Sequence, residues 1–133
     1  MISAQFVPRS RTVTGPRTYR AASGTARVVR EPGPEGGTVV LAAIGEFDVE
    51  TVGCLARALA EARHEGCRRT VLDVSRVEFG DSSFLHVLVT AHFAGRPFVL
   101  MGPVPRQLRQ LFAMTGTLRL FTFTEDRAGP GFA

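Results

Sequence analysis

The chain has 133 residues, of which 44% are hydrophobic, and it contains two cysteines and no tryptophan. This length and composition are typical of one soluble domain with its own core, and no apolar run approaches the roughly 20 residues that cross a bilayer. No signal-peptide pattern is present either, so we expect a cytoplasmic protein without membrane attachment. Cys54 and Cys67 lack metal-binding spacing and are expected to be free thiols. The composition therefore predicts neither a metal site nor a cofactor.

The charge of the chain is unevenly distributed. All 16 basic residues are arginines, and residues 1–30 hold six of them with no acid, whereas residues 31–133 hold ten arginines and twelve acids. The first segment therefore carries +6 and the remainder −2. A specific nucleic-acid-binding domain would show a basic face on the fold itself, so we expect no specific nucleic acid partner. The basic start could still touch nucleic acid or acidic lipid non-specifically.

The predicted elements begin with an extension and a hairpin. Residues 1–24 show no hydrophobic periodicity, which indicates a basic, disordered N-terminal extension, a start codon placed too early or, less favoured, a transit peptide. Residues 25–31 suit a short strand, and residues 32–37 are rich in proline and glycine, as turns are. Residues 38–47 form a β-prone apolar run, which predicts a buried strand. Together these segments predict a β-hairpin.

The following segment changes from strand to helix periodicity. Apolar side chains at helical spacing predict a helix over residues 48–66, with Asp48 or Thr51 capping its start and Gly66 at its end. Residues 67–77 contain a β-prone stretch and predict the next strand. Strand–helix alternation after a hairpin is typical of an α/β fold with a mostly parallel sheet.

The last third continues the alternation. The pattern predicts helices over 82–95 and 103–116, with Gly116 as a C-cap, and strands within 96–102 and 117–126. We therefore expect a single α/β domain over residues 25–126. Its mixed sheet would contain about four or five strands, the opening hairpin antiparallel and the rest parallel, flanked by helices. Residues 127–133 are expected to be a flexible tail.

The stretch FGDSSFLH, residues 79–86, carries the polar groups of greatest interest. Asp and Ser are preferred N-cap residues, so one interpretation is a structural cap between a strand and a helix. A second is the nucleophile of a GDS-type serine esterase. That reaction requires a histidine base oriented by an acid, and His86 and His92 lie on the serine's own predicted helix. The G-x-S-x-G pattern is also absent, because Phe84 stands where the second glycine would be.

A third interpretation makes the serine a substrate of another enzyme. A serine in the first turn of a helix is accessible, and a phosphate there would meet the positive end of the helix dipole. It would also add negative charge beside Asp81 and disfavour a partner docked on that surface. One modification could then switch a protein interaction without refolding the domain.

Several motifs taken in order resemble the STAS domain of anti-sigma factor antagonists. GEFD at residues 45–48 resembles the family's G-E-L-D, and DVSRVEFGDSS at 73–83 resembles its D-L-S-x-V-x-F-x-D-S-S. MGPVPRQLRQLFAMTG at 101–116 resembles its V-G-P-S-P-x-V-x-R-L-L-x-L-T-G. The resemblance covers roughly residues 25–126, and its specificity comes from the agreement of several motifs in order and spacing.

The resemblance implies a non-enzymatic role in partner switching. In that family, the unphosphorylated protein binds an anti-sigma factor that is also a serine kinase, which frees the sigma factor. The kinase then phosphorylates the antagonist, and a PP2C-type phosphatase resets the system. The resemblance assigns the phosphorylated serine to Ser83, with Ser82 as the alternative. It also implies a partner-binding surface, here composed of Glu46, Asp48, Asp81, Ser82, Phe84 and Leu85.

The sequence departs from the family pattern at three positions near the serine. Phe84 and His86 replace two glycines, and Gly80 stands where a large apolar residue is usual. Phe84 is expected either to block the approach of a kinase or to add an apolar contact. An alternative function is therefore a STAS scaffold or protein-binding module without a phosphorylation switch. We expect a monomer or a weak dimer.

Overall fold

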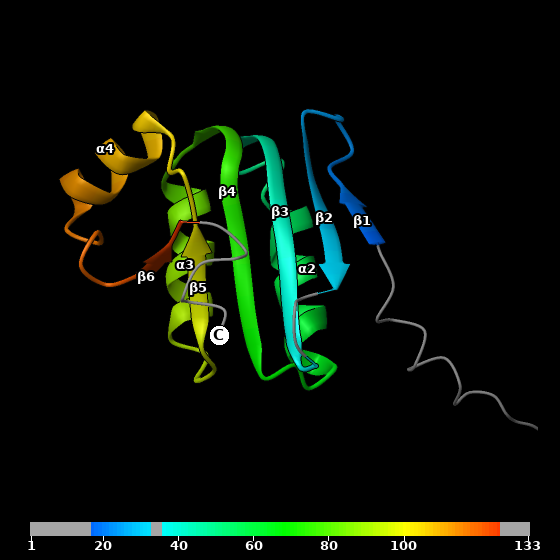
Figure 1. The fold of residues 1–133 in the computed structure, drawn as a ribbon. Coiled ribbons are helices and arrows are strands. Elements are labelled where there is room, and N and C mark those ends of the chain that lie inside the picture. Colours follow the sequence, from blue (N-terminus) through cyan, green and yellow to red (C-terminus); the bar gives the residue numbers. More distant parts are fainter. Residues whose placement is uncertain (1–16, 33–35, 126–133) are drawn as a thin grey trace, which may run out of the picture.

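The computed structural model describes residues 17–32 and 36–125, which form one six-stranded sheet and three helices (Figure 1). The strands follow one another across the sheet in chain order. Their bounds are β1 Arg17–Arg20, β2 Ala26–Pro32, β3 Thr38–Phe47, β4 Arg69–Gly80, β5 Phe98–Met101 and β6 Thr122–Thr124. The helices are α2 Gly53–His64, α3 Ser82–His92 and α4 Arg106–Thr115.

The strand directions agree with the predicted α/β fold. The β1–β2 and β2–β3 pairs are antiparallel, and the β3–β4, β4–β5 and β5–β6 pairs are parallel. The predicted hairpin and the parallel part of the sheet are thus confirmed, but the sheet has six strands instead of about four or five. The parallel strands place the carboxyl ends of β3, β4 and β5 along the same edge of the sheet.

The additional strand is β1, which lies in the segment expected to be disordered. Residues 17–20 pair with residues 27–30 of β2, so the start of the domain at residue 25 was predicted too late. Tyr19 is 5% exposed, and its hydroxyl donates to Glu61 Oε1 of α2 at 2.8 Å. Arg17 forms an ion pair with the same carboxylate. Burial, and the hydrogen bond to Glu61, raise the pKa of the Tyr19 hydroxyl. These long-range contacts hold β1 on the domain.

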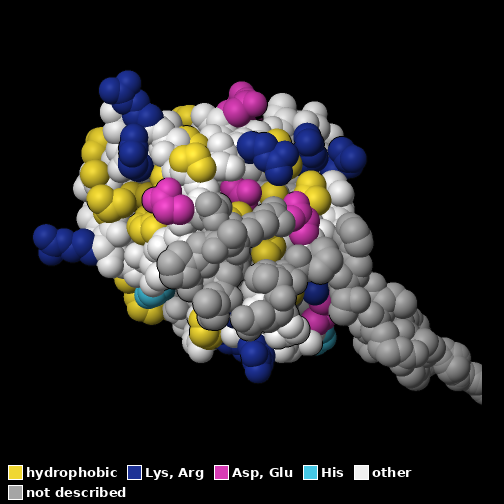
Figure 2. Space-filling model, in the orientation of Figure 1, with side chains coloured by type: hydrophobic (Ala, Val, Ile, Leu, Met, Phe, Trp, Pro, Cys, Tyr) yellow, Lys and Arg dark blue, Asp and Glu magenta, His cyan; other side chains and the backbone are white. Residues whose placement is uncertain are grey.

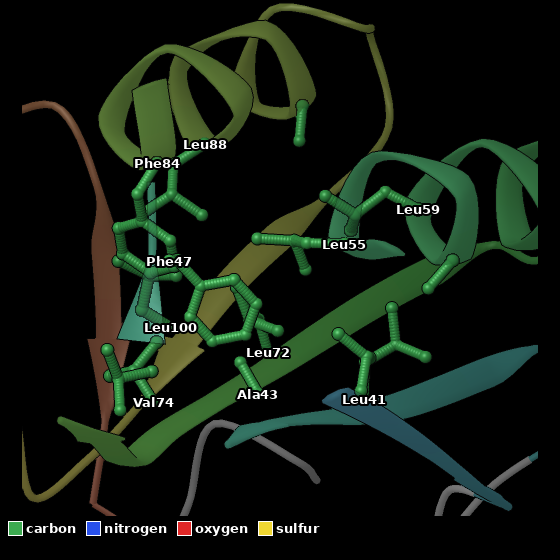
Figure 3. Packing of buried hydrophobic residues seen from close by; sticks show 14 of the residues in the cluster. Leu41, Ala43, Phe47, Leu55, Leu59, Leu72, Val74, Phe84, Leu88 and Leu100 are labelled. Carbon is green, nitrogen blue, oxygen red and sulfur yellow. The ribbon is translucent and has the colours of Figure 1, made fainter. Parts of the chain in front are cut away.

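The main core lies between the sheet and helices α2 and α3, which cover one face (Figure 1). Leu41, Leu72 and Leu100 point from three neighbouring strands toward this layer, and Leu55 and Leu88 meet them from the helices (Figure 3). All five of these side chains are fully buried. The opposite face carries a smaller buried cluster that consists of Val40, Val71, Val99 and Met101. The sheet is therefore apolar on both faces along its central strands, as parallel sheets usually are.

The helix limits differ from the predictions mainly at the start of α2. This helix begins at Gly53, and its N-cap residue Val52 makes no side-chain cap bond. Asp48 and Thr51, the predicted caps, instead stabilise the turn that precedes the helix, as described below. At the other end of the domain, Gly116 is the left-handed C-cap of α4, with φ of 77°, which confirms its predicted role.

Some of the predictions concern residues for which the structure gives little or no description. Residues 1–16 and 126–133, most of the predicted extension and tail, lie outside the described residues. Within the described residues, no helix is long and apolar enough to cross a membrane, and no group of three metal-ligating side chains occurs. Cys54 and Cys67 are free and buried, and burial raises the pKa of the Cys54 thiol.

Gly45 provides a test of the β2–β3 junction. Its φ is +105°, and a Cβ at this position would lie 2.1 Å from the Thr25 carbonyl oxygen. We expect Gly45→Ala to lower the free energy of unfolding by more than about 3 kcal/mol, measured by urea denaturation. Gly24→Ala is the matched control, because Gly24 also has a positive φ of 84° but no atom within 4 Å of the added Cβ. It should cost about 1–2 kcal/mol. Equal losses would contradict the predicted backbone clash.

Candidate functional site

The candidate site lies where the parallel strands β3 and β4 end. Phe47, the last residue of β3, is paired with Gly80, the last residue of β4. One residue further, the Asp81 backbone N–H donates to the Phe47 carbonyl oxygen at 3.2 Å. The two chain segments that follow, which start with Asp48 and Asp81, therefore leave the sheet side by side. Both lead directly into helices, so this edge carries two strand-to-helix connections.

Two irregularities in β4 change which side chains reach the surface near this edge. The register advances from Gly45 opposite Val77 to Glu46 opposite Phe79, which leaves Glu78 as an extra residue on β4; a similar shift occurs between Ala42 and Ile44. A β-bulge of this kind re-aims the side chains that follow it. As a result, both Glu78 and Phe79 are exposed, with 43% of Phe79 accessible. In a regular strand, successive side chains point to opposite faces of the sheet, so one of these two side chains would have been buried.

Asp81 is the N-cap of α3, as the sequence predicted. Its backbone is extended, with φ of −108° and ψ of −163°, and its Oδ1 accepts from the backbone N–H groups of Ser83 at 2.8 Å and Phe84 at 3.2 Å. A cap of this kind stabilises a helix by about 0.5–2 kcal/mol. The cap holds both serines in the first turn of the helix, where Ser82 is exposed and Ser83 is half-buried.

Asp48 organises the neighbouring connection in a similar way. Its Oδ1 accepts from the backbone N–H groups of Glu50 at 2.9 Å and Thr51 at 3.1 Å. The Thr51 hydroxyl is buried, accepts from the Asp48 N–H at 2.9 Å and donates to the Glu46 carbonyl oxygen at 2.9 Å. The turn therefore has a fixed shape, and it holds the side chain of Val49 outward, with 75% of it exposed.

Phe84 lies beneath the first turn of α3 and does not project from it. Its side chain is fully buried, and its ring centroid lies 5.4 Å from that of Phe47 (Figure 3). Leu85 is also buried, with 8% exposed. The prediction that Phe84 and Leu85 contact a partner is therefore wrong for their side chains, because both belong to the core. For the same reason, Phe84 does not obstruct an approach to Ser82 or Ser83.

Gly80 and Phe84 are structurally complementary. A Cβ on Gly80 would lie 2.6 Å from Cδ2 of Phe84 and 3.0 Å from Cδ2 of Leu108. The Phe84 ring thus occupies the space that a side chain at residue 80 would take. The glycine at 80 and the phenylalanine at 84, which are two separate departures in the sequence, together constitute one exchange of side-chain volume between the strand and the helix.

Gln107 of α4 is a site residue that the sequence did not reveal. Its Oε1 accepts from the Gly80 N–H at 2.9 Å, and its Nε2 donates to the Gly80 carbonyl oxygen at 2.7 Å. This pair of bonds satisfies both backbone groups of the last β4 residue and attaches α4 to the edge of the sheet. No signal in the local sequence marks this glutamine as inward-facing, because adjacent helical residues such as the buried Leu108 do not share its face.

The site is negatively charged on its exposed side. The term acidic surface is used here for Glu46, Asp48, Glu50, Glu78 and Asp81, which lie at or directly after the ends of β3 and β4. Glu46, Glu50 and Glu78 are exposed, and the two aspartates are half-buried. No arginine occurs in residues 44–56 or 77–95. The exposed Val49 and Phe79 add apolar area to this surface, and the sequence analysis had not identified either residue.

The structure places the histidines away from a catalytic arrangement. His92 lies edge-on to Phe121, with ring centroids 5.9 Å apart, and His86 is exposed. In the part of the chain that the structure describes, no hydrogen bond joins Ser82 or Ser83 to a histidine. A serine nucleophile needs such a base, so the geometry gives no support to an esterase. What the arrangement offers is an accessible, capped serine turn beside a rigid acidic loop.

Comparison with protein-family models matches residues 33–122 to the model described as "Mlab, STAS domain". The chain belongs to the STAS domain family. The family resemblance of the motifs is thereby confirmed for most of the domain. A search among curated proteins gives no match for this STAS domain.

Solved structures share the fold. An anti-sigma factor antagonist from Mycobacterium paratuberculosis is 22% identical and superposes with a TM-score of 0.60, over 74% of this chain and 86% of that one. The unphosphorylated anti-sigma factor antagonist SpoIIAA is 19% identical, with a TM-score of 0.55, over 67% of this chain and 81% of that one. The phosphorylated form of SpoIIAA, a Bacillus cell fate determinant, is 19% identical and superposes with a TM-score of 0.53, over 70% of this chain and 87% of that one. At these identities the likeness concerns the fold.

A double-mutant cycle tests the exchange between Gly80 and Phe84. We expect Gly80→Ala to cost about 1–3 kcal/mol of unfolding free energy in the natural chain, because the new methyl group meets the Phe84 ring. In a Phe84→Leu background the same change should cost at least about 1 kcal/mol less, since the smaller side chain leaves room. Urea denaturation measures each corner of the cycle. Gly80→Ala combined with Leu59→Ala in α2 is the control and should be additive.

Additive costs for Gly80→Ala and Phe84→Leu, within about 0.5 kcal/mol, would show that the two positions do not share one space.

Proposed function

We propose that this STAS protein is an anti-sigma factor antagonist that binds an anti-sigma factor serine kinase when unphosphorylated and is released by phosphorylation of Ser83. The proposal includes a PP2C-type phosphatase that resets the switch and a cytoplasmic location. The observation that carries it is the Asp81-Ser82-Ser83 turn, held by the Asp81 cap at the end of β4, next to the Asp48 turn. The fold shared with anti-sigma factor antagonists supports the same role.

The cap explains how a phosphate would act at this position. The backbone N–H groups of Ser83 and Phe84 are already bonded to Asp81 Oδ1. A phosphate on Ser83 would bring about −1.5 to −2 charges next to this carboxylate and to the rest of the acidic surface. It would therefore compete with Asp81 for the helix N-terminus or project toward solvent. In either arrangement it changes the surface where the partner docks and leaves the core intact.

The partner surface that we propose differs in part from the residues first expected. Glu46, Asp48, Asp81 and Ser82 remain in it, and the buried Phe84 and Leu85 are replaced by the exposed Val49 and Phe79. These two side chains would provide apolar contacts within an otherwise acidic area. A partner that fits this surface presents basic groups around an apolar pocket.

Phosphopeptide mass spectrometry on protein isolated from its own cells is the first test. Trypsin cleaves after Arg76 but not between Arg96 and Pro97, so it releases residues 77–106 as one peptide that contains both serines. We expect phosphate on Ser83 under at least some growth or stress conditions. Phosphate on Ser82 alone would keep the mechanism and move the site to the more exposed hydroxyl. The absence of phosphate from both serines across conditions would contradict the switch and favour a STAS scaffold that binds partners without modification.

Variants of Ser83 test the consequence for binding. We expect Ser83→Ala to retain the anti-sigma factor kinase in co-purification and Ser83→Asp to lose at least about 90% of it, since the added carboxylate is disfavoured at the docked surface. Thr90→Asp is the matched control, because it adds the same charge to an exposed residue of α3 outside the proposed partner surface, and it should retain the kinase. Unfolding curves for all variants verify that the fold is unchanged. Equal binding by Ser83→Ala and Ser83→Asp would contradict the switch.

A further inference from the structure

The charge of residues 31–125 differs between the two halves of this segment. Residues 31–81 contain ten acidic residues and five arginines, a net charge of −5, whereas residues 82–125 contain four arginines and one acid, Glu125, a net charge of +3. The acids in the first region include the acidic surface at the ends of β3 and β4. Three of the four arginines in the second region lie on or just after α4. These two regions therefore carry net charges of opposite sign, and residues 17–30 before them add four arginines without an acid.

The basic end forms a defined surface. The term α4 surface is used here for Arg106, Arg109, Met114, Leu118 and Arg119, all exposed. Met114 is 85% exposed and Leu118 is 43% exposed. Among the described residues, none of the three arginines forms an ion pair. In Figure 2, arginine and apolar side chains gather at the upper left, where Figure 1 places α4; a second group of arginines lies at the upper right, and acidic side chains are seen at the top, in the middle and at the left.

The acidic surface has the complementary composition. Two exposed apolar side chains, Val49 at 75% and Phe79 at 43%, lie in the same segments as its carboxylates. None of its five acids takes part in an ion pair within the described residues. Each surface thus combines charges of one sign, without ion-pair partners, with two exposed apolar side chains. Oppositely charged patches with apolar centres are complementary for docking.

We propose that the α4 surface of one molecule binds the acidic surface of a second copy of this chain. The occupant is argued from this complementarity, because the same molecule carries both halves of the contact. The β1–β2 hairpin also exposes Arg20 and Arg27, but no large apolar side chain among its described residues is exposed. The hairpin could therefore attract the acidic surface by charge alone, whereas the α4 surface adds apolar contact.

The two surfaces determine which assemblies are possible. Gln107 of α4 is bonded to Gly80, which directly precedes Asp81, so the first turn of α4 lies at the same edge of the sheet as the acidic surface. Neighbouring patches of opposite sign suit a two-fold dimer in which each patch meets its counterpart twice. If the rotation does not close, the same contact produces head-to-tail chains. In both arrangements the second copy covers the acidic surface.

Sedimentation of the full chain provides the first measurement. We expect the average mass to rise with concentration up to about 1 mM at low salt, as for a weak interface. The apparent association constant should fall at least about tenfold when the salt rises from about 0.05 M to 1 M, since the Debye length shortens to about 3 Å. A chain that stays monomeric at about 1 mM and low salt overturns the proposal.

Charge reversal on each side gives the decisive test. Glu50→Arg disrupts the acidic surface and Arg109→Glu disrupts the α4 surface. These positions are chosen because the hydrogen bonds given for Glu50 and Arg109 involve their backbone N–H groups, which the substitutions keep. Each variant alone should be monomeric. Mixed in equal amounts they should form a one-to-one complex, because the intact surface of each meets a compatible surface of the other. Failure of the mixture to associate, or self-association of Arg109→Glu alone, contradicts the proposed contact.

Arg27→Glu is the matched control for charge outside the α4 surface. It should reduce the apparent association constant less than twofold. A reduction equal to that of Arg109→Glu would show that the molecules attract one another only through their overall charge, without a specific contact at α4. The proposal does not rest on the proposed function, and Ser83→Asp separates the two. The added negative charge should maintain or strengthen self-association while it abolishes binding of the kinase. Self-association can therefore be absent while the kinase switch is present, and the reverse can also be observed.

Discussion

The parallel pairing of β3 with β4 is the constraint on which the functional end of the molecule depends. It aligns Phe47 with Gly80 and lets the Asp81 N–H bond to the Phe47 carbonyl, so two strand-to-helix connections start from adjacent points. Each connection then uses one aspartate to satisfy the free backbone N–H groups of its turn. Asp48 and Asp81 are thus structural residues first. Their charge at the surface is a consequence of that role, and the bulge at Glu78 adds a further carboxylate beside them.

The exchange between Gly80 and Phe84 shows how the serine turn can be supported from below. The Phe84 ring fills the space above Gly80 and contacts Phe47, which connects the first turn of α3 to the ends of both strands. Gln107 then holds Gly80 from the side of α4. The turn that carries Ser82 and Ser83 is therefore supported by the buried rings of Phe47 and Phe84 and by the bonds from Gln107 to Gly80. A modification of either serine meets a rigid support, so its effect is confined to the surface.

The sequence predicted much of this arrangement because the relevant signals are local. The hairpin, the order of the strands and helices, the Asp81 cap and the Gly116 C-cap all follow from periodicity and capping preferences within a few residues. The strand β1 was missed because its contacts are long-range: Tyr19 is buried in the main core, and its hydroxyl bonds to Glu61, 42 residues later. Phe84 was misplaced outward because its location depends on the absence of a side chain at Gly80. Gln107 has no local signal that distinguishes it from a solvated glutamine.

The same acidic surface takes part in both proposals, and this has a physical consequence. If a kinase and a second copy of the chain compete for one set of carboxylates, self-association lowers the concentration of free surface and weakens the apparent affinity for the kinase. A phosphate on Ser83 would weaken binding of the kinase, because it repels a partner adapted to the unmodified serine. The same phosphate would strengthen self-association, because it attracts the arginines of α4. The Arg109→Glu variant isolates this effect, since it keeps the acidic surface and removes the competing one. Its affinity for the kinase should exceed that of the natural chain at high protein concentration and equal it at low concentration.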